Sequence, residues 1–250
     1  MFASHDTDGN LVTFMTDRWG GVSEGAYSSL NLGGYCGDDE KAVLLNRKRL
    51  CDELHIQLPQ LVVPKEVHGD CCVWVTRDSM KSDVECDALI TTERNVCVCV
   101  TTADCVPVLL YDVHHTVCAA VHAGWKGVVN CILTKTIAEI CDRLHLLPFS
   151  FHVVVNPCIS VEKFEVGEEV ASQFEELFPL DSSCLIDRKN YAKPHIDLRR
   201  AVALQALSMG VDSKNIQVSN DCTFQDNRFF SARRDGFATG RMVSGVMVRP

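Results

Sequence analysis

Residues 96–145 read VCVCVTTADCVPVLLYDVHHTVCAAVHAGWKGVVNCILTKTIAEICDRLH. The stretch contains three apolar, β-rich runs, at Val96–Val100, Val106–Tyr111 and Thr116–Val121. An apolar stripe with a 3.6-residue period follows over Lys126–His145. Because the runs are apolar at consecutive positions, they are typical of strands that are covered on both faces. The stretch therefore predicts buried strands that lead into a long amphipathic helix.

The same patterns recur on both sides of this stretch. Further strands are expected at Cys72–Val75, Phe151–Val155 and Val243–Val248. Helices are expected over residues 40–55, 166–178 and 197–209, the last with Asp197 as N-cap and Gly210 as a left-handed stop. No repeat, low-complexity tract or linker divides the chain. We therefore predict a single domain, residues 1–250, with strands and helices intermixed.

The composition excludes several classes of protein. The chain has 250 residues, a net charge of −9 and a hydrophobic fraction of 46%. An acidic protein repels the nucleic-acid backbone, so nucleic-acid binding is not expected. No apolar run approaches the ~18 residues of a membrane helix, and the start, MFASHDTDGN, does not resemble a secretory signal. Most of the 14 cysteines, such as Cys97 and Cys99, lie in apolar runs and are interpreted as reduced core residues of a cytoplasmic protein.

The predicted helix Glu40–His55 carries an arginine on its apolar side. Its inward stripe consists of Val43, Leu50, Cys51 and Leu54, and Arg47 falls on the same stripe. A guanidinium turned toward a core needs an anionic partner, because its desolvation is costly. Two interpretations stay open: a buried ion pair with a carboxylate, or an arginine directed at a bound anion such as phosphate.

Three short segments place potential metal ligands next to glycine or proline. They are Glu66–Gly69 (EVHG), Thr102–Pro107 (TADCVP) and Val121–Gly127 (VHAGWKG). In the third, an apolar strand runs into His122 and then into a Gly-x-x-Gly turn before the helix, which is a natural site for an anion. A single histidine at the end of a strand is nevertheless often structural, so this segment alone decides nothing.

Cys105 differs from the other cysteines because Asp104 and Pro107 flank it, instead of a continuous apolar run. With His68 and His122 it forms a plausible His/Cys/His set. Such a set can bind zinc and leave a fourth position for water or substrate. The same residues can also act without metal, as a thiolate activated by a histidine. The spacing does not choose between these two interpretations.

Along nearly its whole length the sequence resembles the family of polyphenol oxidase or laccase-like proteins. Members of this family are also described as purine nucleoside phosphorylases with adenosine deaminase activity. The shared segments are RWGGVS (18–23), SLNLG (29–33), GD (37–38), NR (46–47), VHG (67–69), CDALIT (86–91), TADCVPVLL (102–110), VHAGWKG (121–127), FEVGEEV (164–170) and FFSARRDGFATGRM (229–242). Three positions depart from the family pattern: Glu66 replaces a usual Gln, Lys126 a common Arg, and Asn156 a usual Gly. Since the ligand positions are intact, these changes concern substrate preference.

The resemblance implies an α+β fold in which β-sheets are layered with helices (α/β/β/α), similar to the catalytic fold of the cytotoxic necrotising factors. It also implies that His68, Cys105 and His122 bind a single zinc. The implied reactions are phosphorolysis of adenosine, inosine, guanosine and methylthioadenosine to base and ribose 1-phosphate, and deamination of adenosine. Purine nucleosides and phosphate would be its partners, and copper could replace zinc in an N/S site.

Roles for individual residues follow as hypotheses. Phosphate would be held by Arg47, by the start of the helix after His122, and by Lys126 or Arg234. Asp104 or Glu66 would move the proton in deamination. For Asp104, a turn residue that bonds its own backbone is an equal alternative.

Three other functions remain in view. A multicopper oxidase needs clustered histidines, whereas the nine in this chain are scattered. A cysteine hydrolase or amidase, for example in cell-wall precursor editing, would use Cys105 as its nucleophile. A purely structural zinc in a binding module is disfavoured, because structural zinc sites usually have four protein ligands. The oligomeric state is not indicated by the sequence.

Overall fold

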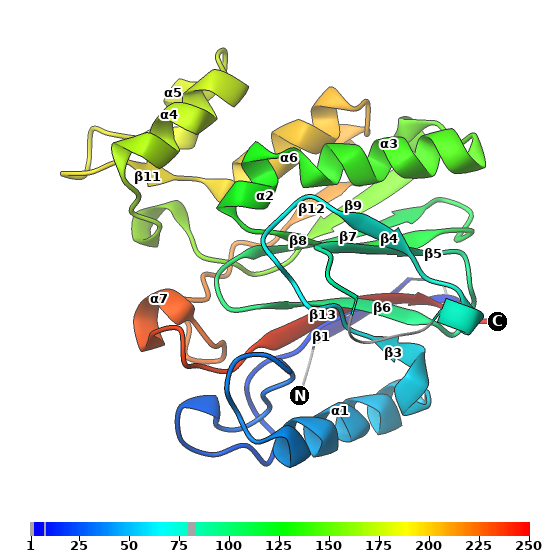
Figure 1. Cartoon of the computed structure of the whole chain (residues 1–250). Coiled ribbons are helices and arrows are strands. Elements are labelled where there is room, and N and C mark those ends of the chain that lie inside the picture. The colour runs from blue at the N-terminus through cyan, green and yellow to red at the C-terminus, as the bar shows by residue number, and fades with distance from the viewer. Residues whose placement is uncertain (1–2, 8, 80–83) are drawn as a thin grey trace.

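Two β-sheets lie face to face at the centre of the computed structural model, which describes residues 3–7, 9–79 and 84–250 (Figure 1). The first sheet has five strands in the order β1 (Ala3–Thr7), β2 (Leu11–Met15), β13 (Met242–Val248), β6 (Cys97–Thr102) and β3 (Leu61–Val62). Its neighbouring strands are antiparallel except for β3 and β6. The chain ends therefore meet in one sheet, which also contains the first strand of the stretch quoted above.

The second sheet has six strands. Their order is β12 (Ile216–Val218), β9 (Phe151–Val155), β7 (Val106–Asp112), β8 (Cys118–Ala123), β5 (Ala88–Thr91) and β4 (Cys72–Trp74). The outer pairs β12–β9 and β4–β5 are parallel, and the inner pairs are antiparallel. A separate pair, β10 (Ile186–Asp187) and β11 (His195–Ile196), stands apart from both sheets. The six strands expected from the sequence are all present, with ends shifted by one or two residues.

Helices cover the outer face of each sheet (Figure 1). Helix α1 (Glu40–Leu54) lies against the five-stranded sheet, and α2 (Trp125–Val129), α3 (Ile132–Leu144) and α6 (Leu198–Ser208) lie against the six-stranded one. The described chain also contains α4 (Glu168–Leu177), α5 (Ser182–Leu185) and α7 (Ala232–Asp235). The chain thus folds as a single α+β domain in four layers, helix, sheet, sheet and helix, as expected.

The apolar runs are continuous because each central strand has two buried faces. Along β6, Val98 and Val100 face the core between the sheets, whereas Cys97 and Cys99 face the core under α1. Every residue of β6, β7 and β8 is buried. Burial on both sides removes the polar alternation that a half-exposed strand would show.

One expected helix is interrupted. The pattern over residues 126–145 predicts a continuous helix, but α2 ends at Val129 and α3 starts at Ile132. Between them Cys131 adopts φ 59°, in the left-handed region, where no helix continues. The apolar stripe resumes on the same side after the break, so the periodicity does not reveal it. By contrast, α6 is as expected: Asp197 accepts a hydrogen bond from the N–H of Arg200, and Gly210 has φ 95°.

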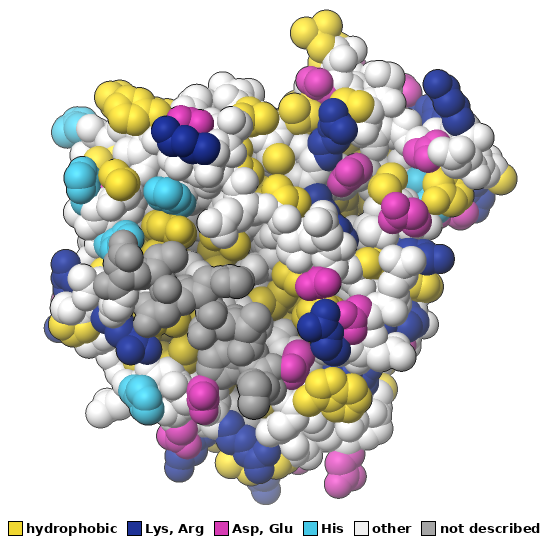
Figure 2. Space-filling model, turned by 180° about the vertical axis from the view of Figure 1, so that it is seen from behind, with side chains coloured by type: hydrophobic (Ala, Val, Ile, Leu, Met, Phe, Trp, Pro, Cys, Tyr) yellow, Lys and Arg dark blue, Asp and Glu magenta, His cyan; other side chains and the backbone are white. Residues whose placement is uncertain are grey.

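The burial of the cysteines and the distribution of surface charge agree with the sequence predictions in most places. Cys97, Cys99 and Cys118 are buried, whereas Cys131 is half-buried. Figure 2 shows basic and acidic side chains interspersed among apolar ones on the face it presents, with no continuous basic area among the coloured side chains. No helix in the described part of the chain is long and apolar enough to cross a membrane.

Candidate metal centre and pocket

The three expected ligands converge at one end of the six-stranded sheet. Cys105 lies in the turn before β7, His122 lies near the end of the adjacent β8, and His68 lies in the loop before β4. One donor atom from each residue lies within 4.8 Å of the others, and Sγ of Cys105 is 4.0 Å from Nε2 of His68. Among the described residues this is the one group of three or more such side chains that could hold a metal. The predicted convergence is confirmed.

A buried aspartate that the sequence analysis did not single out organises these ligands. Asp87 is fully buried, at the end of the loop before β5. Its carboxylate accepts hydrogen bonds from the backbone N–H groups of His68 (2.9 Å) and Gly69 (2.7 Å) and from Nδ1 of His122 (2.8 Å). This leaves Nε2 of His122 for a metal, an arrangement common in metal sites. The feature of the sequence that could have indicated Asp87 is its charge within the otherwise apolar segment CDALIT.

The site is electrostatically coupled. Burial alone would raise the pKa of the Cys105 thiol, but the adjacent His122 and His68 imidazoles lower it to about 6. Burial alone would lower the pKa of His122, but the Cys105 thiolate and the Asp87 carboxylate raise it to about 10. The two shifts have the same cause, because the thiolate and the imidazolium stabilise each other, and a bound cation would replace the proton.

Gly124 leaves the space that the three ligands need. A Cβ atom at this position would lie 3.2 Å from both Sγ of Cys105 and Cδ2 of His68, and 3.7 Å from Cε1 of His122. Two imidazoles and a thiolate form a donor set that suits zinc or copper. The donor set, the carboxylate behind His122 and the small residue beside the ligands all fit a bound metal.

The ligands line a pocket of about 700 Å³. This volume lies within the usual range of small-molecule sites, about 300–1,000 Å³. The wall combines aromatic groups, such as Trp125 and Phe237, with charged groups. The charged side chains that line it are Glu66, Asp104, Lys126, Arg233 and Arg241.

Glu66 lies on the pocket wall, close to the ligands, as the sequence analysis expected. Its carboxylate accepts hydrogen bonds from the backbone N–H (2.6 Å) and the hydroxyl (2.9 Å) of Thr101. Burial raises the pKa of the Glu66 carboxyl, against the opposing effects of His122 and the Thr101 bonds. The chain thus contains a partly desolvated carboxyl group beside the candidate metal position.

Asp104 has a different environment from the one expected. Oδ1 accepts a hydrogen bond from the Thr223 hydroxyl (2.6 Å), and Oδ2 accepts from the Ser231 hydroxyl (2.9 Å) and the Arg233 N–H (2.7 Å). Both oxygens thus hold a segment more than a hundred residues away and not the backbone of their own turn. Asp104 therefore positions the 223–233 segment next to Cys105. The role of Asp104 in proton transfer stays a prediction.

The cationic residues divide into three groups. Lys126 lines the pocket, as expected, and is exposed. Arg47 is half-buried and lies behind the wall: its Nε donates to the carbonyl of Leu32, and its Nη2 lies 3.3 Å from where a Cβ on Gly34 would be. Arg234, the alternative to Lys126, does not line this pocket, and its guanidinium donates to backbone carbonyls and to an acidic side chain. Those partners are Thr223, Phe224, Asp226, Phe229 and Asp235.

The neighbouring Arg233 does line the pocket, together with Arg241. Nη1 of Arg233 donates to the carbonyls of Lys163 (3.3 Å) and Glu165 (3.0 Å). The sequence showed only an Arg-Arg pair and could not tell which member faces inward. Asn156, the third departure from the family pattern, is not among the residues that line this pocket.

Comparisons with known proteins agree on one family. The model described as "Multi-copper polyphenol oxidoreductase laccase" matches residues 12–249. The chain is 38% identical to the purine nucleoside phosphorylase of Bacteroides thetaiotaomicron, over 96% of this chain and 92% of that protein. It is 34% identical to adenosine deaminase RL5 of an unknown prokaryotic organism, over 94% and 93% of the two chains.

The fold agrees with the same relationship. The crystal structure of YlmD from Geobacillus stearothermophilus superposes with a TM-score of 0.92 at 31% identity, covering 96% of this chain and 93% of that one. That of the protein YfiH from Bacillus licheniformis gives a TM-score of 0.91 at 27% identity, with the same coverage. Sequence and fold therefore place the chain in the multi-copper polyphenol oxidoreductase laccase family, which includes curated purine nucleoside phosphorylases and an adenosine deaminase.

Proposed function

We propose that this protein is a metal-dependent purine nucleoside enzyme. It cleaves adenosine, inosine, guanosine and methylthioadenosine with phosphate to give the free base and a ribose 1-phosphate, and it deaminates adenosine. The observation that carries the proposal is the His68–Cys105–His122 group, which opens onto a 700 Å³ pocket lined by cationic side chains. The names of the relatives supply the reaction class.

His68, Cys105 and His122 would hold the metal, with Asp87 fixing the tautomer of His122. We favour zinc, while copper also suits the donor set. When bound, the ion supplies a Lewis acid that polarises a substrate oxygen or lowers the pKa of a water molecule. The reduced cysteines of the chain favour a cytoplasmic setting.

Phosphate binding is assigned to Lys126 and Arg233, which both line the pocket wall. Phosphorolysis needs an anion held beside the anomeric carbon of the ribose, and cations on the wall fulfil that need. Arg47 acts indirectly, through the Gly33–Gly34 segment that its guanidinium supports. This assignment replaces Arg234, whose guanidinium is committed elsewhere.

Glu66 is assigned the proton transfer in deamination, because it lines the pocket and its carboxyl is anchored by Thr101. Phosphate is assigned to the cations of the pocket wall, so the carboxyl should matter less for phosphorolysis. We expect Glu66→Gln to lower the rate of deamination by about tenfold to a hundredfold. The rate of phosphorolysis should change less than threefold. Equal losses in both reactions would contradict this role and indicate a positioning residue.

The test of the proposed function is product identification. Protein of measured zinc and copper content is incubated with adenosine, with and without phosphate, and the products are identified by mass spectrometry. Adenine and ribose 1-phosphate that form only with phosphate demonstrate phosphorolysis, and inosine demonstrates deamination. If neither appears at one zinc per chain, the nucleoside proposal is wrong.

A cysteine hydrolase is the second candidate, and one specific observation favours it. The His122 and His68 imidazoles lower the pKa of the Cys105 thiol, and its sulfur lies 4.0 Å from Nε2 of His68, which could act as its base after a small approach. The similarity to the cytotoxic necrotising factor fold that the family resemblance implies is a second argument for the hydrolase. Amide hydrolysis by metal-free protein would favour it, and strict dependence of all activity on the metal would exclude it. A copper-dependent polyphenol oxidase would instead oxidise phenols when loaded with copper.

A further inference from the structure

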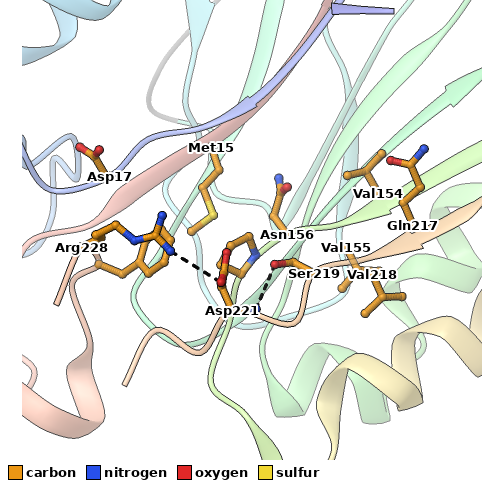
Figure 3. Close-up of a pocket in the computed structure, with 12 residues that line it drawn as sticks. Met15, Asp17, Val154, Val155, Asn156, Gln217, Val218, Ser219, Asp221 and Arg228 are labelled. Carbon is orange, nitrogen blue, oxygen red and sulfur yellow. Dashed lines mark hydrogen bonds and ion pairs between the residues drawn. The ribbon is translucent and has the colours of Figure 1, made fainter. Parts of the chain in front are cut away.

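A second cavity, of about 320 Å³, lies at the open edge between the two sheets (Figure 3). Met15 at the end of β2 contributes one side, and the ends of β9 and β12 contribute the other. The segment that follows β12 completes it with Asp221, Arg228 and Phe229. None of its lining residues is shared with the metal pocket. Its volume is at the lower end of the range for small-molecule sites, so it suits a single ring system better than a nucleotide.

Asn156 gives this cavity a polar group that lacks a partner. The residue is only 7% exposed, and its Nδ2 has no hydrogen-bond partner in the part of the chain that the structure describes. Figure 3 shows its carboxamide extending from the end of β9, between Met15 and Val154 in that view. Buried donors are almost always hydrogen-bonded, so an isolated one needs an explanation. A ligand with a hydrogen-bond acceptor at this depth would satisfy it.

The mouth of the cavity is acidic. Asp17 and Asp221 line it, and its one lining cation, Arg228, is paired with Asp226 (2.6 Å) and Asp221 (3.6 Å). Three carboxylates thus surround one guanidinium. This charge balance disfavours phosphate-bearing ligands and favours a ligand that presents an amino group or a positive charge.

The remaining walls are apolar. Met15, Val155, Pro157 and Phe229 offer flat or flexible surfaces that suit a planar ring. We propose that the cavity binds a small amino-substituted nitrogen heterocycle. A ring acceptor of the ligand bonds Nδ2 of Asn156, and its amino group faces the carboxylates of Asp17 and Asp221.

The cavity is linked to the metal pocket through one segment. Asp221, Arg228 and Phe229 line the cavity, while Thr223, Ser231 and the N–H of Arg233 hold Asp104 beside Cys105. Met15 and Phe229 also pack in one apolar cluster with Ala103, which lines the metal pocket. A ligand in the cavity contacts both the segment that holds Asp104 and the apolar cluster that includes Ala103. Its binding therefore changes turnover at the metal pocket. This coupling rests on the proposed function, whereas the binding itself does not.

The probes are cytosine and uracil, which have the same ring size and differ in the amino group. Binding to the metal-loaded protein is measured by isothermal titration calorimetry without substrate. We expect saturable binding of cytosine with one site per chain in the cavity, and binding of uracil at least tenfold weaker. Asn156→Ala and Asp221→Asn should each weaken cytosine binding at least fivefold while metal content stays the same. Lys126→Ala, in the other pocket, is the matched control and should leave cytosine binding unchanged.

Several results would overturn the proposal. They are the absence of saturable cytosine binding at millimolar concentration, equal binding of uracil, and wild-type binding by both cavity variants. Because Asp221 is exposed at the mouth, Asp221→Asn tests the site even if Asn156→Ala folds poorly. For the coupling, saturating cytosine should change kcat/KM for the nucleoside at least twofold in the wild type and not in Asn156→Ala. An unchanged kcat/KM with binding intact would remove the coupling and leave the site.

Discussion

The two ends of strand β7 carry similar residues in different arrangements. At its start, Cys105 meets His122 and His68, and the buried Asp87 bonds the His122 ring. At its other end, the equally buried Asp112 accepts hydrogen bonds from the N–H groups of three residues of the turn that follows and from a hydroxyl there. These partners are His114, Thr116 and Val117, with the Thr116 hydroxyl as the fourth donor.

Histidines are present at both ends, yet only one end brings three donor atoms together. At the far end the rings of His115 and His152 contact Tyr111, at 5.8 and 5.1 Å between centroids, instead of converging on a common point. The difference lies in what each aspartate holds. Asp87 joins a loop and a strand that are distant in the sequence, whereas Asp112 closes the turn that follows it. The types of residue present therefore do not determine where a metal site forms. The hydrogen bonds that join distant segments do.

The largest effect is expected at the ligands. Cys105→Ala removes the one thiolate of the donor set, so we expect loss of tightly bound metal and a fall in nucleoside turnover of at least a thousandfold. Metal content is measured by mass spectrometry and turnover with adenosine and phosphate. His115→Ala, at the other end of β7, is the control and should keep both. A Cys105→Ala protein that retains full metal but no activity would contradict the ligand role and favour the nucleophile.

The two aspartates provide the second test. Asp87→Asn keeps the shape of the side chain but weakens its bond to Nδ1 of His122, so metal affinity should fall by about tenfold to a hundredfold. Asp112→Asn should leave metal affinity unchanged and lower the free energy of unfolding by about 1–3 kcal/mol, because its partners are backbone groups of one turn. Competition with a chelator and chemical denaturation measure the two quantities. If both variants lost metal equally, the contrast between the two ends would be wrong.

The sequence predicts the parts of this arrangement that depend on local pattern. The continuous apolar runs identify β6, β7 and β8, and the capping pattern identifies α6. The family resemblance implies the ligand set His68, Cys105 and His122, and the three side chains do converge. What the sequence does not reveal depends on contacts across the fold. Examples are the hydrogen bonds of Asp104 to the 223–233 segment.

The break between α2 and α3 at Cys131 is missed for a different reason. A single left-handed residue leaves the apolar period of the sequence intact. Which of Arg233 and Arg234 lines the pocket also depends on contacts across the fold, as the role of Asp104 does. These adjacent residues of a short helix donate to carbonyls of different segments: Arg234 to the loop at 223–229, and Arg233 to residues 163 and 165. Local pattern therefore predicts elements better than it predicts which charged side chains line the pocket.

The smallest effect concerns these arginines. Arg47 supports the Gly33–Gly34 wall from behind, so Arg47→Ala should raise the KM for phosphate by about three- to tenfold, no more than ~1.4 kcal/mol, with metal content unchanged. Arg234→Ala should instead lower the midpoint of thermal unfolding, because five backbone or acidic partners lose their donor, and should leave the KM for phosphate unchanged. Phosphate-dependent kinetics and thermal unfolding of both variants separate the two roles. A KM for phosphate that rose only in Arg234→Ala would contradict the role of Arg47 and favour Arg234, one of the phosphate ligands that the sequence predicts.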